Sequence, residues 1–374
     1  MAPLRFVEET QTETGAWAAS SAGISTDLLR NGVITEIRAT VELTPSATLA
    51  GANQPDGLWR VIQNLSIVGG SQTYMTLPSK TEPVGGTLLH YLNRFDGYGL
   101  GHPIGVITAP QRSFTPINFV LHCGTRNRNR FGHLYPEDLS GFIPTSPESR
   151  LRALWVTGAN TVMDDTVTIT SGVLRLDVKS WLGSEQEIMG EMRAQGVMLP
   201  PGAKCMVPQW SAEIYSHTAT FSDYSAERNV PTGGYLRRII IVEQDDTTTG
   251  GRGLRAGDQV TGVAVKLSKD GTHLKRVTVE QMLSDFPPAN VVEADDAALD
   301  FGGFTANGIF VLDMASHVPV SRHGHAEYGL NMETFGVGDI KLAFTISVYA
   351  SGDASAILYE RLVPNLGLQG RAFA

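Results

Sequence analysis

The chain has 374 residues and a formal net charge of −9, with 18% charged and 42% hydrophobic residues. This length is too great for one ordinary hydrophobic core and suits two domains. The acidic balance argues against a protein that coats nucleic acid, because a phosphate-binding surface needs a surplus of Lys and Arg, and it leaves room only for a local basic patch.

Residues 1–22 are the first predicted segment, which is polar and rich in Thr, Ser and Ala. The segment lacks the apolar stretch of a signal peptide, and no later window approaches the roughly 18–20 apolar residues of a membrane-spanning helix. Phe6 and Trp17 are its large anchors. We expect an N-terminal arm or edge strand in which Phe6 and Trp17 contact a neighbouring subunit or a membrane.

Strand patterns dominate from residue 33 onward. Between Val33 and Leu43, apolar residues alternate with Glu36, Arg38 and Thr40, which is the period of two that a half-buried strand shows. Further strands are predicted at 59–68, 117–122, 151–156, 166–170 and 173–178. Residues 87–95 have a helical pattern. We expect a short helix there, which ends at Asp96-Gly97.

A helical linker is predicted at 183–200, the one stretch without a strand pattern. Ser184 is a candidate N-cap, Glu residues follow it, and Arg193 stands near the end, where a positive charge suits the helix dipole. The segment Leu199-Pro200-Pro201-Gly202 then ends the helix.

Strand patterns return in the second half. The predicted strands lie at 206–215, 235–243, 259–268, 273–278, 308–312, 340–350 and 357–363. A second short helix is predicted at 279–286, ended by Pro287-Pro288, at the place that corresponds to the helix at 87–95.

Five short motif pairs recur in the same order in the two halves. The pairs are Trp17–Ala22 with Phe221–Ala226, Gly32 with Gly234, Leu65–Ile67 with Val265–Leu267, Phe119–Leu121 with Phe310–Leu312, and Arg152–Val156 with Leu342–Ile346. Their separation falls steadily along the chain, which indicates one duplication followed by trimming of loops in the second copy. The alternative is that any two strand-rich segments look alike.

This organisation predicts an all-β protein made of two tandem eight-stranded jelly rolls, with short helices in loops and a helical linker. The predicted parts are an N-terminal arm (1–22), a first jelly roll (23–182), a linker helix (183–200), a second jelly roll (201–352) and a C-terminal strand or tail (353–374).

Three histidines, His317, His323 and His325, lie together and raise the question of a metal site. A tandem jelly roll invites comparison with bicupins, whose site needs His-x-His, a Glu roughly four or five residues later and a third His downstream. Here Glu327 follows His325 too soon, and no later histidine exists. We therefore expect no metal, and interpret these histidines as part of a solvated or interface loop.

Arg126, Arg128 and Arg130 alternate in the segment that corresponds to the histidine loop. On an extended chain they project to one side, where they could contact phosphates or the acidic residues of a neighbouring subunit. The alternative is an exposed loop with solvated charges.

Motifs for catalysis are absent from the sequence. There is no phosphate loop, no Gly-x-Ser-x-Gly and no His-Glu-x-x-His, and the paired acids at 164–165, 245–246 and 295–296 stand in turns. Cys123 and Cys205 have no metal-ligand spacing and are interpreted as buried thiols of a protein made in a reducing cytoplasm. We expect a protein that is not an enzyme and has no cofactor.

Two strand-rich copies, a short helix at the same point in each, a linker and an N-terminal arm resemble the double jelly-roll major capsid proteins of tailless icosahedral viruses, which often contain a membrane. The resemblance covers nearly the whole chain and concerns architecture, since that family has no short diagnostic motif to match. It implies a homotrimer whose six jelly rolls form a pseudo-hexagonal block in the virion shell, made in the host cytoplasm.

The resemblance also implies partners. These are lattice neighbours of the same chain, minor capsid or penton proteins and a lipid bilayer beneath the shell, with no direct sequence-specific binding of nucleic acid. The candidate contacts are Phe6, Trp17, Arg126, Arg128, Arg130, His317, His323 and His325. The alternatives are a minor spike or receptor-binding protein of the virion and a tandem β-sandwich carbohydrate-active protein.

Overall fold

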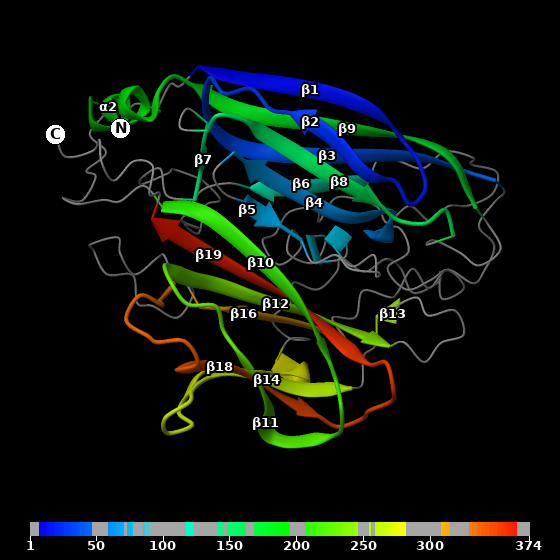
Figure 1. Ribbon diagram of the computed structural model, residues 1–374, viewed down its shortest axis with the longest axis vertical. Helices are drawn as coiled ribbons and strands as arrows, with labels where there is room; N and C mark the ends of the chain where they lie inside the picture. The colour runs from blue at the N-terminus through cyan, green and yellow to red at the C-terminus, as the bar shows by residue number, and fades with distance from the viewer. Residues whose placement is uncertain are drawn as a thin grey trace.

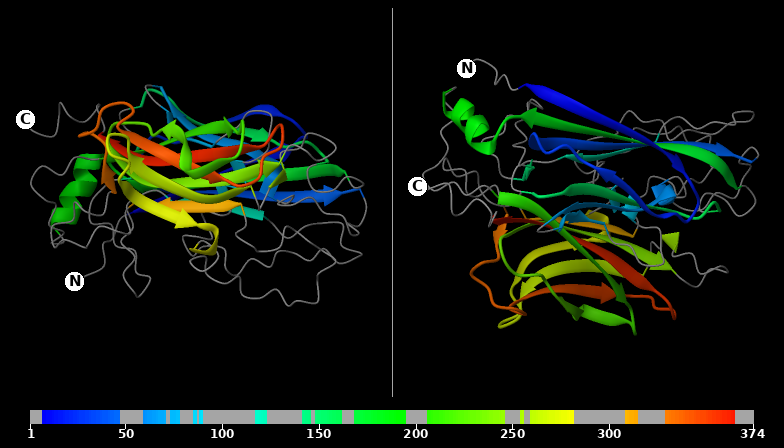
Figure 2. Two further views of the ribbon diagram at one scale, coloured as in Figure 1. Left: turned by 90° about the horizontal axis from the view of Figure 1, so that it is seen from below. Right: turned by 45° about the horizontal axis from the view of Figure 1, so that its top comes forward.

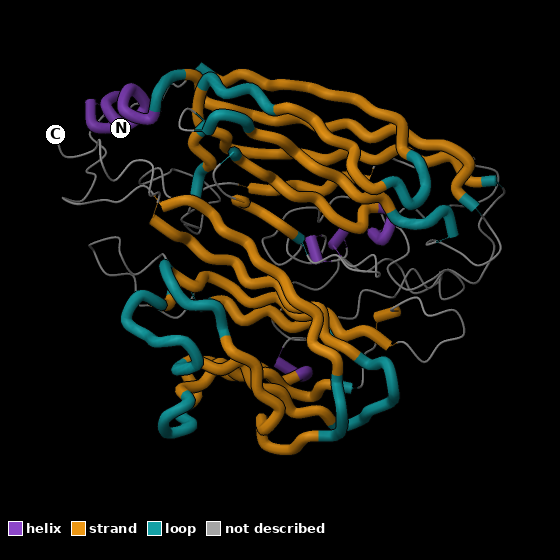
Figure 3. The backbone as a smooth tube through the Cα atoms, in the orientation of Figure 1, coloured by secondary structure: helices purple, strands orange, loops and turns teal. Residues whose placement is uncertain are grey.

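The computed structural model shows that the described part of the chain consists mostly of antiparallel strands, arranged in four sheets (Figures 1 and 3). The structure describes residues 7–46, 59–70, 73–77, 85–86, 88–89, 117–122, 141–145, 148–161, 168–194, 206–245, 254–255, 259–281, 308–314 and 329–364.

The first half of the chain forms two sheets, which together we call the first roll. The β1 sheet contains, in order, β1 (Glu8–Trp17), β9 (Ile169–Leu182), β3 (Gly32–Pro45) and β6 (Ile117–His122), with β7 (Ile143–Pro144) paired to β3. The β2 sheet contains β2 (Ala22–Asp27), β8 (Leu151–Thr157), β4 (Ile62–Gly69) and β5 (Thr73–Thr76), and the 3-10 turn η1 (Trp59–Val61) precedes β4.

The second half, the second roll, repeats this order with one added short strand, β13. The β10 sheet contains β10 (Met206–Ser216), β19 (Ala354–Pro364), β12 (Tyr235–Asp245) and, all paired to β12, β13 (Leu254–Arg255), β16 (Ile309–Asp313) and β17 (Leu330–Asn331). The β11 sheet contains β11 (Phe221–Asn229), β18 (Ile340–Ile346), β14 (Val260–Leu267) and β15 (His273–Thr278). Each half therefore has the eight-strand order of a jelly roll.

Irregularities in strand pairing recur at corresponding places in the two rolls. The three pairs of register shifts are Ile34/Glu36 with Leu236/Arg238, Ile62/Asn64 with Val260/Gly262, and Ile67/Val68 with Val265/Lys266. A bulge is a local feature that unrelated sheets have no reason to share. Their recurrence supports a duplication more strongly than strand order does.

Two of the motif pairs fall on equivalent positions. Phe119 pairs with Ala39 and Phe310 pairs with Ile241, and these partners stand at the same point along β3 and β12. Gly32 and Gly234 open those strands, and a Cβ atom on either would clash with a backbone carbonyl of the neighbouring strand. Both predicted equivalences are confirmed by the strand register.

The other motif pairs were aligned wrongly. The pair in β8 and β18 is one residue out, because Trp155 is buried and its true equivalent, Phe344, is buried in the same register. Leu65 corresponds to Val263 and not to Val265, since these are the partners of Trp155 and Phe344. The first pair joins the end of β1 to the start of β11, which are different strands.

The predicted ends of the two rolls also need correction. β1, assigned to the N-terminal arm, pairs with β9 along its whole length. β19, assigned to the C-terminal strand or tail (353–374), lies in the middle of the β10 sheet between β10 and β12. Each roll therefore begins and ends with adjacent strands of the same sheet, and the sequence boundaries cut both rolls short.

The predicted linker helix is present as α2 (Glu185–Ala194). Ser184 caps it, since its hydroxyl accepts a hydrogen bond from the backbone N–H of Glu187 (3.2 Å) and the Glu187 carboxylate accepts one from the backbone N–H of Ser184 (2.7 Å). Helical residues also occur between corresponding strands of the two rolls. Residues 88–89 and 279–281 lie within the two predicted short helices, and residues 85–86 lie just before the first of them.

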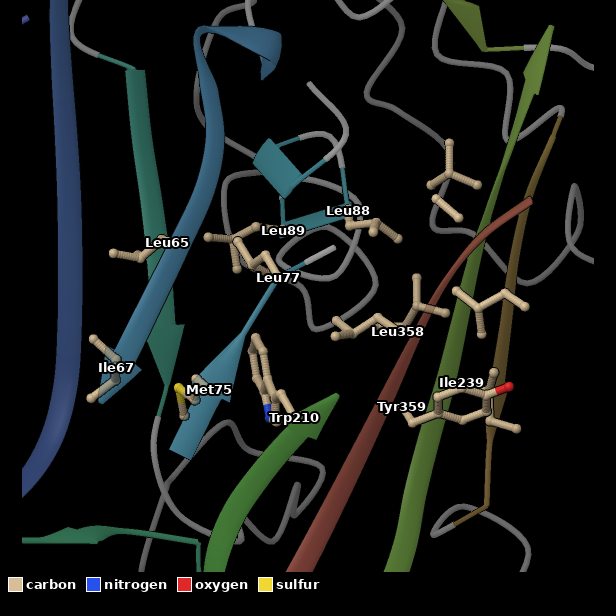
Figure 4. Close-up of a cluster of buried hydrophobic side chains, with 14 of the residues drawn as sticks. Leu65, Ile67, Met75, Leu77, Leu88, Leu89, Trp210, Ile239, Leu358 and Tyr359 are labelled. Atoms are coloured by element: carbon tan, nitrogen blue, oxygen red, sulfur yellow. The ribbon is translucent and has the colours of Figure 1, made fainter. Parts of the chain in front are cut away.

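The two rolls pack side by side around one continuous core (Figures 1 and 2). The edge strand β10 of the second roll contacts β5 and β7 of the first roll. Figure 4 shows the junction, where Trp210 of β10 lies beside Met75 of β5. The chain is thus a single block of four stacked sheets.

Candidate assembly surfaces

Trp17 is a core residue and not an assembly contact. Its side chain is 5% exposed, and its indole N–H donates a hydrogen bond to the Val61 carbonyl (3.2 Å) inside the first roll. The prediction failed because the polar composition of residues 1–22 favoured an arm that reaches a neighbour. The edge strand, which was the other interpretation of this segment, is what the structure shows.

The other predicted contacts lie outside the described residues. They are Phe6, Arg126, Arg128, Arg130, His317, His323 and His325. The two cysteines also lie outside that part of the chain.

The outward face of the β1 sheet is polar and open to solvent. Its exposed side chains include a row of threonines on β1, Thr10, Thr12 and Thr14. Charged side chains follow on the neighbouring strands, where Lys179 contacts Glu36 (3.7 Å), Arg38 contacts Glu36 (3.2 Å) and Arg175 contacts Asp177 (3.0 Å). This outward face is therefore charged and polar, not apolar.

The face of the β10 sheet that corresponds to the outward face of the β1 sheet is apolar. By strand register, Trp210 stands where the first roll has Thr10, Ile240 where it has Arg38, and Leu358 where it has Asp177. All three are buried, because this face is covered by the first roll (Figure 4). One face of the repeated unit is therefore apolar where the chain itself covers it and polar where it does not.

An ion pair shows the same contrast. Lys179 and Glu36 in the first roll correspond to Glu360 and Arg238 in the second, with the charges exchanged. The second pair is short (2.5 Å), and its side chains are 6% and 10% exposed. Burial raises the pKa of Glu360, but Arg238 and Arg237 outweigh it and hold that pKa below its usual value.

His217 is a buried titratable group at the end of β10. It occupies the place that Trp17 has in the first roll, next to the start of β19. Its Nε2 atom shares a hydrogen bond with the Ser355 hydroxyl (2.9 Å), and burial lowers its pKa to about 4. His217 is therefore neutral in the folded protein at neutral pH.

The described residues contain neither a metal-binding cluster nor a membrane-spanning helix. Within that part of the chain, no group of three or more His, Cys, Asp or Glu side chains is placed to hold a metal ion. None of the described helices is long and apolar enough to cross a membrane.

Solved structures match the whole length of the chain. The major capsid protein of STIV, the Sulfolobus Turreted Icosahedral Virus, matches with a TM-score of 0.64 and 15% identity over 99% of this chain and 100% of that one. The chain shares the double jelly-roll fold of capsid proteins. The major capsid protein P2 of bacteriophage PM2 also matches, with a TM-score of 0.50 and 11% identity over 96% of this chain and 100% of that one. No family model and no curated protein sequence matches the chain.

Sequence reasoning missed the junction between the rolls, although a signal was present. The run Ile239–Val242 is apolar at every position, and a strand with such a run is buried on both faces. β3, its counterpart, alternates and has one face in solvent. Comparison of the two strands could have shown which roll is covered by the other.

Proposed function

We propose that the protein is a structural, non-enzymatic major capsid protein that forms the shell of an icosahedral virus. The observation that carries the proposal is the tandem fold, which matches the STIV major capsid protein over nearly the full length of both chains. Identity of 15% supports the fold and not the activity, so the role in a shell is an inference from architecture.

The contact between the rolls supports a ring of subunits. It joins the β2 sheet of one roll to the β10 sheet of the next, and these are different faces of the repeated unit. A contact between unlike faces can repeat from one copy to the next, and it closes into a ring if the rotation allows. The corresponding faces are the outward faces of the β1 and β11 sheets, against which no other sheet of the described part of the chain packs (Figures 1 and 2). Three chains would then give six rolls, as in the predicted trimer.

The remaining predicted contacts belong to this proposal. Arg126, Arg128 and Arg130, and likewise His317, His323 and His325, belong to corresponding segments of the sequence. They are proposed to contact neighbouring trimers, minor capsid proteins or a lipid bilayer. Phe6 precedes β1 and is proposed to contact a neighbour. The protein is proposed to be made in the host cytoplasm and to reside in the capsid without direct sequence-specific binding of nucleic acid.

Abundance and assembly test the proposal. In purified particles this chain should be the dominant band on a stained gel, and the recombinant protein should scatter light as a trimer that resists dilution. A minor band would favour a spike or receptor-binding protein instead. A stable monomer would contradict the shell role.

A further inference from the structure

A cleft of about 370 Å³ opens between the two sheets of the first roll, at their exposed edge. Its walls are residues 13–15 of β1 and residues 25–27 of β2. Trp155, Leu174 and Leu176 form its bottom, and each is 3% exposed or less. The cleft thus leads from a polar rim down to the apolar core of the roll.

In the second roll, larger side chains occupy the corresponding place. By register, Tyr215 stands where the first roll has Gly15, and Arg228 stands where it has Thr26. The Tyr215 ring packs on Phe344, the counterpart of Trp155, with ring centroids 5.3 Å apart. The Arg228 guanidinium lies over the Tyr215 ring, 4.8 Å from its centroid. An aromatic ring and a cation are therefore what this fold accommodates at this position.

The rim of the cleft carries the complementary charge. Glu13 accepts a hydrogen bond from the Gln11 side chain (3.1 Å) and has no cation beside it in the described part of the chain. Asp27 is 3.1 Å from Arg150 in an exposed pair. One uncompensated carboxylate over an apolar bottom favours a ligand that combines an aromatic ring with a positive charge.

We propose that the cleft binds residues 365–374 of a second copy of this chain, with the Phe373 ring at the bottom and Arg371 at the acidic rim. In an extended segment, residues two apart project to the same side, so Arg371 and Phe373 can enter together. Arg5 and Phe6 also join a cation to a ring, but as neighbours they project to opposite sides.

Residues 365–374 are proposed to come from a second copy because of the position at which this segment leaves the second roll. β19 ends at Pro364 in the second roll, at the end of the molecule where α2 lies (Figure 1). The cleft lies in the first roll, towards the opposite end of β1, beside Trp17. The contact would therefore link subunits, whether or not the protein builds a shell.

Photo-cross-linking of the full chain tests this placement. Phe373 is replaced by the photoreactive aromatic p-benzoylphenylalanine, and light and nitrogen-15-labelled copies are mixed before irradiation. Mass spectrometry should find cross-links from position 373 to residues 13–15, 25–27 or 174–176, and these should join light to heavy chains. Cross-links elsewhere, or within one chain only, would overturn the proposal.

Variants of the cleft supply the controls. Gly15→Tyr copies the plug of the second roll and should reduce the cross-link at least about tenfold, the effect expected when a buried aromatic anchor is lost. Glu13→Lys, at an exposed position, should reduce it at low salt without changing the melting temperature, and Arg371→Glu should act in the same direction. Thr26→Ser should leave it unchanged. If the cross-link persists in folded Gly15→Tyr protein, the cleft is not the binding site.

Discussion

The environment of individual residues, and not their type, distinguishes the two rolls. Glu360 and Lys179 occupy equivalent positions, and each forms an ion pair, although their charges are opposite. Only the Glu360 side chain is buried. Removal of one partner leaves a charge without compensation in a buried pair, whereas in an exposed pair water replaces the partner. The same substitution should therefore have different effects at the two sites.

Glu360→Gln should lower the free energy of unfolding by about 3–5 kcal/mol, because Arg238 stays buried without its carboxylate. Lys179→Gln, the matched control, should cost about 1 kcal/mol or less. Urea denaturation at neutral pH measures both. Because the folded pKa of Glu360 is lowered, its stabilising effect is present above the unfolded pKa and is lost as pH falls through the folded value. Equal effects of the two substitutions would contradict the assigned burial.

His217 should make the second roll sensitive to acid. Its folded pKa of about 4 lies below the unfolded value, so the unfolded chain takes up a proton first as the pH falls. Between roughly pH 6.5 and 4 this linkage should cost about 2 kcal/mol of stability, which His217→Gln should remove. Denaturation midpoints measured across this range test the prediction, with the exposed His273→Gln as a control. An unchanged acid loss in His217→Gln protein would mean that other groups cause it.

Among the elements, β1 shows how an edge strand can resemble a flexible arm. Its sequence is polar because one face and one edge meet solvent, and charged side chains on an exposed edge protect it from pairing with other chains. Amino-acid composition does not show that β1 is hydrogen-bonded to β9. Trp17 was therefore the one residue that indicated a place for this strand in the roll. Its burial could be inferred only with the Val61 carbonyl and the core in view.

Deletion of residues 2–17 should therefore destabilise the first roll, whereas deletion of residues 2–6 should not. The longer deletion removes β1, leaves the edge of β9 unpaired and opens the core beneath Trp17. Circular dichroism on heating should show a large loss of melting temperature for the longer deletion alone. A fully stable protein without residues 2–17 would restore the interpretation of this segment as an arm.

Sequence patterns predicted most of the long strands but missed β2 and β11, and they predicted strand registers poorly. Alternation in β3 identified its buried face, because its other face meets water. The offset between β8 and β18 came out one residue wrong, because it matched Ala153 with Ala343, and a shared residue type carries no information on strand pairing. The cleft could not be predicted from the sequence, because it is lined by residues of two different sheets, Gly15 of β1 and Thr26 of β2. Pairing information is what single-sequence reasoning lacks.

At the scale of the whole molecule, the junction between the rolls should contribute much of the stability. Trp210→Ala should cost about 3–5 kcal/mol, because a large buried side chain leaves a cavity between the rolls. Thr10→Ala, at the equivalent but exposed position, should stay within about 0.5 kcal/mol. Urea denaturation compares the two variants. Similar costs would show that the outward face of the β1 sheet is covered in solution.

Trimer formation is the last consequence of the repeated unit. If the polar outward face of the β1 sheet meets the β11 sheet of a neighbour, the contact between chains is hydrogen-bonded and charged, unlike the apolar junction within the chain. Such a contact weakens with salt, and reversing its charges should break it without unfolding the chain. We expect the double variant Arg38→Glu with Lys179→Glu to scatter light as a folded monomer under conditions in which the unmodified protein is a trimer. Glu227→Lys, on the β11 sheet, tests the opposite face. If both variants remain trimeric at any salt concentration, subunits associate through other surfaces, and the contact within the chain is no guide to the contact between chains.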